Sequence, residues 1–362
     1  MKTIGSTPLP AGGRLPRNKG VRRLACVFAA GLLVTLGCRE DTTSPSAPES
    51  AASTTSAAPA LALALAANTW TTRAPTPGIP HTDFAAGAAA NAAGQWFVHI
   101  FGGQNGDGTG FASAKYNVST NTWGGGGGAF INAAYLNGVG KIGNRFYMTG
   151  GESCCDVDFR NFNTTWAYDI TTNQLFQKAD MPRATRNGVT GVIKGKLYVL
   201  AGYCSGEAVD PGHCTVGSVV RQFYRYDPAT NTWINRRQPP HFHTDGGGAV
   251  LGDKFYVVGG GGQGPYLDVY DPVTNTWTTR APIPATGERL SAAVIQNRIF
   301  VIVLTGFSSR KPVLKAFSYD PVTNTWKSKA APPVFGPIVR VQLNGQGRLF
   351  LPGSPSSYLY TP

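Results

Sequence analysis

Short apolar runs that end in glycine recur at regular intervals along residues 68–362. Six runs have this form, and they end at the following glycines: Gly102-Gly103, Gly150-Gly151, Gly202, Gly259-Gly260, Gly306 and Gly353. Polar turns such as Gly252-Asp253-Lys254 stand within these units, where two short strands would meet. The pattern therefore predicts repeated pairs of short strands joined by tight turns.

A second hairpin follows five of these runs, and it carries a recurring sequence that begins with Tyr. The regular copies are Tyr226–Trp233, Tyr270–Trp277 and Tyr319–Trp326, and the weaker copies are Tyr116–Trp123 and Tyr168–Leu175. Asp followed by Pro opens a turn, because the Asp carboxylate accepts turn N–H groups and Pro presets φ. The later Asn tolerates a left-handed backbone. We therefore expect Tyr and Trp on the two paired strands, as large packing groups.

The length of the repeat indicates how the units are arranged. The Trp residues recur about every fifty residues, which is the length of a four-stranded propeller blade. The chain ends at Tyr360-Thr361-Pro362, where other copies continue with Asp-Pro, and Asn68-Thr69-Trp70 would complete that copy. We therefore expect an all-β fold, a six-bladed β-propeller closed by pairing of the N-terminal and C-terminal strands in the last blade.

The double glycine, Tyr-Asp-Pro and Asn-x-Trp signatures resemble those of kelch-repeat β-propellers over residues 68–362. The resemblance implies that Tyr226, Asp227, Trp233 and Trp277 are structural. It indicates little about activity, since kelch propellers include galactose oxidase, the periplasmic sialic acid epimerase and pure binding scaffolds. No stretch matches the copper site of galactose oxidase residue by residue, so we expect no metal and no cofactor.

The first 37 residues are typical of an export signal, because basic residues precede an apolar run from Leu24 to Leu36. Gly37-Cys38 at its end resembles a bacterial lipoprotein signal, which implies lipidation of Cys38 and an outer-membrane or cell-surface lipoprotein. Ordinary signal cleavage, which would give a periplasmic or secreted protein, stays open. Residues 38–67 are rich in Ala, Ser, Thr and Pro, and we expect a flexible tether.

Charge changes this picture little. The chain has 32 Lys and Arg against 19 Asp and Glu, but six of the basic residues and no acidic residue fall in the export signal. The rest carries 26 basic against 19 acidic residues, or +7. These charges are scattered, so we expect no nucleic-acid partner.

The segments that lead into the innermost strands are expected to surround one end of the central channel, with the loops after the glycines. We place these segments at His81–Asp83, Phe130–Asn132, Arg183–Asn187, His241–Asp245, Glu288-Arg289 and Arg340. Five of the six carry a charged or imidazole group. This end of the channel is therefore the predicted binding site.

The tripeptide His-Thr-Asp occurs twice among these segments, at His81–Asp83 and His243–Asp245. The first and fourth units face each other in a six-fold ring, so the two His and two Asp side chains could bind a metal or clamp a polar ligand. They could equally cap turns at the rim. We favour the turn role, because no close ligand spacing supports a metal.

The second candidate set consists of arginines and their neighbours around the same opening: Arg183, Arg186, Asn187, Glu288, Arg289 and Arg340. Guanidinium groups suit carboxylate or phosphate ligands, so an acidic sugar is the natural ligand for such a set. The alternative is that these arginines form structural hydrogen bonds to neighbouring blades. We favour that structural role.

Four cysteines of the predicted propeller, Cys154, Cys155, Cys204 and Cys214, are expected to form disulfides in an exported protein. Four cysteines allow three pairings. A bond between Cys204 and Cys214 would close one loop, and bonds between the loops of the second and third units are the alternative. Both stay open.

Two classes of function fit these features. The first is a membrane-tethered, monomeric, non-catalytic propeller that binds a glycan or another protein at the cell envelope. The second is an epimerase-like or mutarotase-like enzyme, in which Arg186, Arg289 and Arg340 hold a sugar carboxylate and Glu288 or His243 is the acid or base. We prefer the first, because catalysis requires a positioned acid and base, whereas binding requires only a rigid polar rim.

Overall fold

The computed structural model describes residues 66–75, 83–103, 112–130, 133–153, 161–204, 218–353 and 355–362. The chain separates into two compact units, Met1–Leu61 and Ala62–Pro362, and all described residues belong to the second. The predicted export signal and Cys38 lie outside the described residues, as does almost all of the tether. Among the described residues, no helix is long and apolar enough to cross a membrane.

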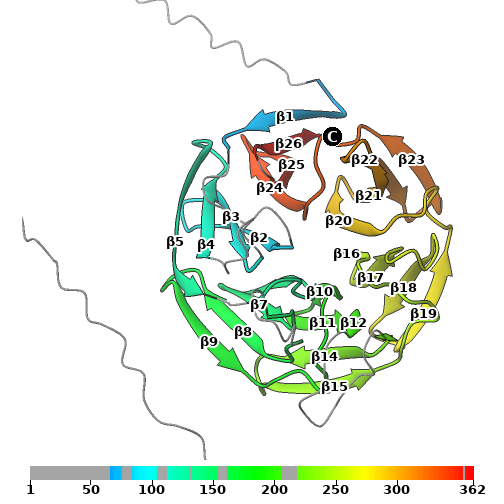
Figure 1. Ribbon diagram of the computed structural model, residues 1–362. Helices are drawn as coiled ribbons and strands as arrows, with labels where there is room; N and C mark the ends of the chain where they lie inside the picture. Colours follow the sequence, from blue (N-terminus) through cyan, green and yellow to red (C-terminus); the bar gives the residue numbers. More distant parts are fainter. Residues whose placement is uncertain are drawn as a thin grey trace, which may run out of the picture. The chain divides into compact units, whose positions relative to one another are not determined.

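Six four-stranded antiparallel sheets form the blades of a propeller around a central axis (Figure 1). Blades 1 to 3 contain the strands β2 (Ala85–Ala90), β3 (Trp96–Phe101), β4 (Ala112–Asn117) and β5 (Thr122–Phe130); β6 (Val139–Ile142), β7 (Arg145–Thr149), β8 (Thr165–Asp169) and β9 (Gln174–Lys178); β10 (Val189–Ile193), β11 (Lys196–Leu200), β14 (Phe223–Asp227) and β15 (Thr232–Arg236). Blades 4 to 6 contain β16 (Gly247–Leu251), β17 (Lys254–Val258), β18 (Leu267–Asp271) and β19 (Thr276–Arg280); β20 (Arg289–Ile295), β21 (Arg298–Ser308), β22 (Lys311–Asp320) and β23 (Thr325–Lys329); β24 (Val339–Leu343), β25 (Gln346–Leu351), β26 (Ser357–Thr361) and β1 (Thr69–Arg73).

The sixth blade closes the ring with strands from both ends of the propeller. Its strand order is β24-β25-β26-β1, and β1 pairs antiparallel with β26 from Thr69 opposite Thr361 to Arg73 opposite Ser357. This pairing confirms the predicted closure. It also covers the outer edge of β26, which would otherwise expose unpaired backbone groups.

The repeated Tyr residues form the core between blades. The Tyr of every copy is fully buried, and these residues are Tyr116, Tyr168, Tyr226, Tyr270, Tyr319 and Tyr360. Tyr226 on β14 lies opposite Trp233 on β15, and their ring centroids are 5.0 Å apart. In the turn between them, Asp227 Oδ1 accepts the Ala229 N–H and Asn231 has φ +55°. The predicted hairpin, with its turn and its facing aromatics, is confirmed.

The same residues also fasten each blade to the one before it. In blade 4, Asn275 Oδ1 accepts the Tyr270 hydroxyl at 2.8 Å and the backbone N–H of Arg237, which follows blade 3, at 3.2 Å. Trp277 Nε1 in turn donates to the carbonyl of Arg237 at 2.6 Å. We call this set of Tyr, Asn, Trp and the neighbouring backbone the clasp.

The clasp recurs around the ring. Among the described residues, the Asn residues that accept both a Tyr hydroxyl and a backbone N–H of the preceding blade are Asn68, Asn121, Asn231, Asn275 and Asn324. Asn68 directly precedes β1 and Trp70 lies in it. Their side chains hydrogen-bond to the backbone N–H and carbonyl of Ala330, just after the last strand of blade 5. In blade 2 the Trp position is Leu175, whose side chain has no N–H to donate, although Asn173 still accepts the Tyr168 hydroxyl. The weakest copy of the repeat therefore lacks the Trp hydrogen bond of the clasp.

Cys204 ends β12 (Tyr203–Cys204), which pairs with β13 (Ser218–Val219) in a two-stranded ribbon between β11 and β14. Cys204 is disulfide-bonded. Its partner lies outside the described residues, as do Cys154, Cys155 and Cys214, so the pairing stays a prediction.

Candidate functional site: the channel mouth

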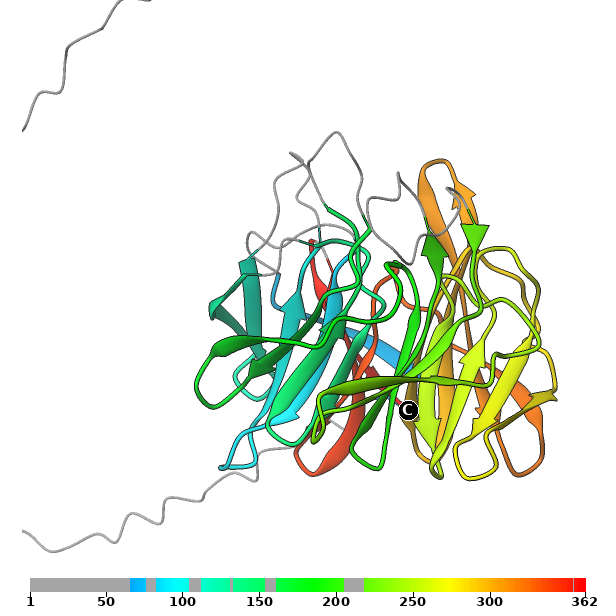
Figure 2. The ribbon, with the colours of Figure 1, turned by 90° about the horizontal axis from the view of Figure 1, so that it is seen from below.

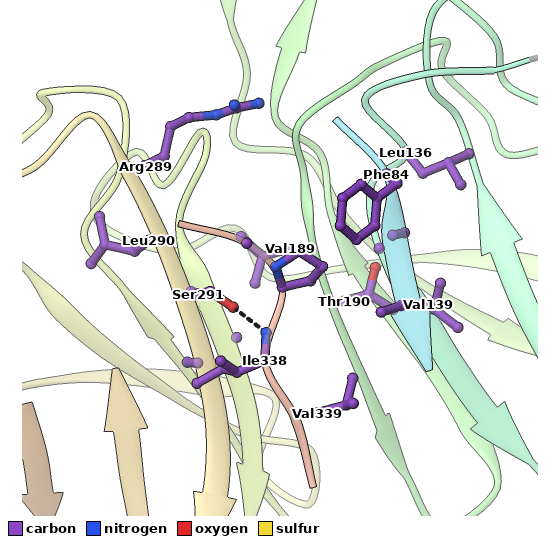
Figure 3. Close-up of a pocket in the computed structure, with 18 of the residues that line it drawn as sticks. Phe84, Leu136, Val139, Val189, Thr190, Arg289, Leu290, Ser291, Ile338 and Val339 are labelled. Atoms are coloured by element: carbon purple, nitrogen blue, oxygen red, sulfur yellow. Dashed lines mark hydrogen bonds between the residues drawn. The ribbon is translucent and has the colours of Figure 1, made fainter. Parts of the chain in front are cut away.

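A cavity of about 700 Å³ lies at the centre of the ring. Its wall is built from the innermost strand of each blade, namely β2, β6, β10, β16, β20 and β24, and from the segments that lead into them. Small residues such as Ala86, Gly247 and Ala292 line its interior, so the strands leave space at the axis. Figure 3 shows part of this wall, with Arg289 extending over the cavity.

A chain of backbone hydrogen bonds runs around one end of the cavity from blade to blade. Tyr135 N–H donates to Asp83, Asn187 N–H to Tyr135, Asp245 N–H to Asn187, and Leu290 N–H to Asp245, at 2.8 to 3.0 Å. Each bond links neighbouring blades, so the chain of bonds joins one residue from each of blades 1 to 5, and in blade 5 this residue is Leu290, directly after Arg289. We call Asp83, Tyr135, Asn187, Asp245 and Arg289 the mouth residues.

Four mouth residues adopt a left-handed backbone. The φ angles are +64° at Asp83, +55° at Tyr135, +51° at Asn187 and +55° at Asp245. Asn and Asp tolerate this conformation, but it is costly for a bulky residue such as Tyr. Strained backbone that a fold maintains at a cavity is a common feature of functional sites.

Arg289 of blade 5 bridges two carboxylates across the mouth. Its Nη2 donates to Asp83 Oδ1 of blade 1, and its Nε donates to Asp245 Oδ1 of blade 4 at 3.4 Å. Burial lowers the pKa of the guanidinium, but the charges of Asp83 and Asp245 outweigh burial and raise it. The side chain is one-third exposed, so this bridge lies at the solvent boundary of the cavity.

Tyr135 lies between two arginines. The guanidinium carbons of Arg186 and Arg289 are 5.0 and 5.9 Å from its ring centroid, within the range of cation–π contacts. Burial and the neighbouring Asp83 carboxylate raise the pKa of its hydroxyl to about 12, although both arginines oppose this shift. The hydroxyl therefore keeps its proton at any physiological pH.

Arg186 is itself held by a buried carboxylate. Its Nε lies 2.5 Å from Glu152 Oε2, and its guanidinium carbon is 4.9 Å from the ring of Tyr203. Glu152 is almost fully buried. The charge of Arg186 is thus matched within the protein.

The Asp245 carboxyl group of the mouth is mostly buried, with 20% of its side chain exposed. Burial raises its pKa, and Arg289, Asn187 and Arg186 oppose the shift. The result is a partly desolvated carboxylate that can accept hydrogen bonds from a ligand hydroxyl. Asn187 beside it supplies an amide, so acceptor and donor groups lie together at the mouth.

The hairpin of β21 and β22 forms one side of the cavity above the mouth residues. These strands run to Ser308 and from Lys311, and the hairpin projects beyond the body of the blades as the orange loop in Figure 2. Phe307 and Pro312 face each other across it, and both line the cavity. Phe307 is 63% exposed, so it presents an aromatic face to solvent at the edge of the cavity.

The predicted arginine set does not converge on one point. Arg340 pairs with Leu349, which pairs with Tyr360, whereas Val294 occupies the matching place in blade 5. Arg340 therefore lies five residues further along its strand than Arg289, which is about 16 Å at 3.3 Å per residue. Both line the cavity, but at different depths.

Three other predicted residues lie away from the cavity. Glu288 is exposed and does not line it. Arg183 is half-buried, and its charge acts on the hydroxyl of Tyr224, whose pKa burial raises. His243 is buried inside blade 4, with a side chain that has no exposed surface. The predicted acid or base roles of Glu288 and His243 thus lack access to the cavity, and His81 lies outside the described residues.

Sequence reasoning missed two residues of the site. The second blade contributes Tyr135 to the mouth, five residues after the end of β5 at Phe130. Of the predicted segment Phe130–Asn132, residues 131 and 132 lie outside the described residues. Phe307 was missed because it follows the glycine that marks the end of the apolar run. An aromatic residue directly after Gly306 is the signal that could have identified it. Among the residues described, no group of three or more His, Cys, Asp or Glu side chains could hold a metal ion.

Comparisons with known proteins agree with this architecture. The family model described as Kelch motif matches residues 184–238, which include all four strands of blade 3. The solved structure described as "Structure of YjhT" matches with a TM-score of 0.57 at 16% identity, over 78% of this chain and 94% of that one. At that identity the likeness concerns the fold.

Two curated relatives match by sequence over shorter stretches. The N-acetylneuraminate epimerase of Haemophilus influenzae (strain PittEE) is 30% identical over 138 residues, 38% of this chain and 31% of that protein. The Kelch-like protein terF of Aspergillus terreus (strain NIH 2624 / FGSC A1156) is 30% identical over 122 residues, 33% of this chain and 25% of that protein. The match thus spans less than a third of the length of each of these relatives. The protein is thus a six-bladed β-propeller, and its residues 184–238 match the Kelch motif.

Proposed function

We propose that this propeller is a binding module at the cell envelope, that its binding site is the channel mouth, and that its ligand is a neutral glycan. A kelch propeller fits an interaction module. The tether of residues 38–67, with a lipid on Cys38, would hold it at a membrane. The observation that carries the proposal is the asymmetric mouth, where five blades contribute Asp, Tyr, Asn, Asp and Arg side chains beside one chain of backbone hydrogen bonds.

The shape and lining of the cavity suit a sugar. Its volume of about 700 Å³ lies within the usual range for small-molecule sites. Asp245 and Asn187 offer an acceptor and an amide for ring hydroxyls. Phe307 offers an exposed aromatic face, which can pack against the apolar face of a sugar ring.

The charge at the mouth favours a neutral ligand over a sugar acid. Arg186 and Arg289 face Glu152, Asp83 and Asp245, so two positive charges meet three negative charges and the set carries a net charge of −1. A ligand carboxylate would have to displace one of these internal partners. Because Arg340 lies at another depth, it does not add to a carboxylate clamp at the mouth.

The second candidate is a sugar-acid epimerase or mutarotase. The similarity of 138 residues to N-acetylneuraminate epimerases supports it. In this case Asp245 would be the acid or base, because burial raises its pKa and it lines the cavity. Glu288 and His243, which lie away from the cavity, would have no such role.

Thermal unfolding of the full chain with single sugars separates the two candidates. A ligand that binds only the folded state raises the free energy of unfolding, by about 2.7 kcal/mol at a hundred times its dissociation constant. We expect galactose, N-acetylglucosamine or another neutral sugar to raise the melting temperature. A shift with N-acetylneuraminate alone would favour the enzyme and contradict the proposed ligand class.

Two phenylalanine variants locate the site. Phe307→Ala removes the aromatic face at the cavity and should abolish the shift. Phe242→Ala is the matched control, because Phe242 is also exposed but packs on Arg221 and does not line the cavity. If Phe307→Ala binds as well as the unaltered chain, the channel mouth is not the site.

A further inference from the structure

Blade 4 contains a buried carboxylate that two histidines share. Asp268 on β18 has no exposed surface. Its Oδ2 lies 3.0 Å from His241 Nδ1 and 3.0 Å from His243 Nε2. His241 is partly exposed and stacks on Tyr266 with ring centroids 3.6 Å apart, whereas the His243 side chain is fully buried.

The hydrogen bonds around Asp268 require it to be ionised. The Thr279 hydroxyl donates to Oδ1 at 2.7 Å, and the backbone N–H of His241 donates to Oδ2 at 3.3 Å, in addition to the two imidazole contacts. Burial raises the pKa of this carboxyl group, but the hydrogen bonds from His243, Thr279 and His241 lower it by more. A carboxylate that accepts this many donors has no room for a proton of its own.

The two ring nitrogens of His243 both face acceptors. Nδ1 lies 3.1 Å from the carbonyl oxygen of Gly259, which can only accept. Nε2 lies 3.0 Å from Asp268 Oδ2, which accepts because the carboxylate is ionised. A neutral imidazole has one N–H and would leave one of these contacts without a donor. Only the doubly protonated ring satisfies both.

We propose that His243 is held as an imidazolium in a buried ion pair with Asp268, and that this pair is a pH-sensitive latch on the mouth segment of blade 4. Loss of the proton at rising pH leaves one of the two contacts without a donor, inside a site that has no water-exposed surface. An unmade buried contact of this kind is costly. The latch therefore loosens as pH rises.

The latch acts on the mouth because of the residues beside it. The carbonyl of His243 accepts the N–H of Gly246, and between them Asp245 donates its N–H to the Asn187 carbonyl in the chain of backbone bonds. Gly259, which the imidazole contacts, begins the double glycine of the same blade. A loosened His243 therefore frees both the segment that presents Asp245 and the loop that follows β17.

The groups that face His243 come from three elements. β18 contributes the Asp268 carboxylate, β19 contributes the Thr279 hydroxyl through that carboxylate, and the loop after β17 contributes the Gly259 carbonyl. The Tyr266 ring stacks on His241, which shares the same carboxylate. His241 contacts the same carboxylate through Nδ1 and keeps its other ring nitrogen away from it. His243 therefore differs from His241 in having no nitrogen left for solvent.

NMR of the full chain with ¹⁵N-labelled histidine tests the proposal directly. The chain has five histidines, so their ring signals can be assigned with single variants. We expect His243 to show two slowly exchanging ring N–H groups at pH 7.5, where a free imidazole is mostly neutral. His99 is the internal control, because burial, with Lys115 nearby, lowers its pKa to about 4 and leaves it a single ring N–H.

Two variants can each assign the ring N–H signals of His243. His243→Gln should remove the doubly protonated signals, and His241→Gln, at a partly exposed position, should keep them if the first variant does not fold. A single ring N–H on His243 between pH 6 and 7.5 would overturn the proposal.

Hydrogen exchange measures the latch itself. We expect the protection of a peptide that covers residues 243–251 to fall about tenfold more than that of residues 133–142 as pH rises from 6 to 9. The reference peptide begins in the corresponding mouth segment of blade 2, which has no such ion pair among its described contacts. Equal changes in the two peptides would show that deprotonation does not loosen the mouth, which contradicts the second half of the proposal.

Discussion

The outer clasps and the channel mouth both draw one set of residues from successive blades. The clasp residues are repeated from blade to blade, whereas the mouth residues differ. Five clasps use the same Asn and Trp side chains to hold the same backbone groups. At the mouth the corresponding segments of blades 1 to 5 supply Asp, Tyr, Asn, Asp and Arg side chains. Repetition at the clasp makes a ring, whereas variation at the mouth makes an asymmetric site.

The difference assigns separate tasks to the two regions. A clasp residue satisfies buried polar groups of two blades, so its loss should affect folding. A mouth residue stands at the edge of a cavity and is already balanced by its neighbours, so its loss should affect binding more than folding. Substitutions in each region test this separation.

The largest loss of stability is expected for Asn275→Ala. The change leaves the Tyr270 hydroxyl and the Arg237 N–H without their acceptor and forces Ala into a left-handed backbone at φ +56°. Lost acceptors cost about 1–3 kcal/mol and the backbone about 1 kcal/mol, so the free energy of unfolding should fall by about 3 kcal/mol. Urea denaturation measures it.

Asn344→Ala is the matched control for that substitution. Asn344 has φ +52° in the exposed turn between β24 and β25, and its side chain has no hydrogen bond with the described part of the chain. It should lose only the backbone contribution, about 1 kcal/mol. Equal losses for both variants would contradict the role given to the clasp.

The second largest loss of stability is expected for Trp277→Leu. Leu is the residue that blade 2 already has at this position, as Leu175. The variant loses the bond from Nε1 to the Arg237 carbonyl and the ring contacts with Tyr270 and Phe223, whose centroids lie 5.1 and 5.0 Å away. We expect a loss of about 2 kcal/mol, less than for a fully buried Trp because Leu keeps part of the packing. Trp277→Phe, which keeps an aromatic ring, should lose about half as much.

A smaller and pH-dependent effect is expected for Arg289→Met at the mouth. The variant leaves Asp83 and Asp245 without their shared cation, at a cost of about 1–2 kcal/mol at pH 7 once the partial exposure of Arg289 is considered. Burial raises the pKa of Asp245 above its value in the unfolded chain, so below pH 7 the folded state takes up the proton first. Protonation of Asp245 therefore makes the folded state more stable relative to the unfolded chain as pH falls. Arg289 opposes that shift, so thermal unfolding between pH 7 and 4 should show the variant recovering relative to the unaltered chain. A pH-independent difference would contradict the proposed bridge.

The smallest effect on stability is expected for Phe307→Ala. The side chain is largely exposed, so the free energy of unfolding should change by less than about 0.5 kcal/mol. The same variant should lose glycan binding. A large loss of stability would show that the hairpin is structural and would blur the separation between the two regions.

The sequence was sufficient for the regular part of the molecule. Six blades, the closure by β1 and β26, and the Tyr and Trp packing were all predictable, because each depends on a repeated local pattern and on spacing. The mouth was only partly predictable. Asp83, Asn187, Asp245 and Arg289 were found as the polar residues before an innermost strand.

The remaining features depend on distances that the sequence does not contain. The strand lengths differ between blades, so Tyr135 could not be located by counting from the end of β5, and Arg340 was placed at the mouth although it lies deeper. His243 was predicted beside the channel, but its neighbour Asp268 on another strand draws it into the blade. A shared tripeptide at His81–Asp83 and His243–Asp245 did not reveal that partner.

One measurement tests the central claim most directly: hydrogen exchange of the full chain with and without the neutral sugar that gives the largest thermal shift. The account predicts added protection in the peptides that carry Tyr135, Asn187, Asp245 and Arg289, and no change in the outer turns that carry Asn231 and Asn275. Protection at the outer turns, with an unchanged mouth, would contradict the assignment of binding to the channel.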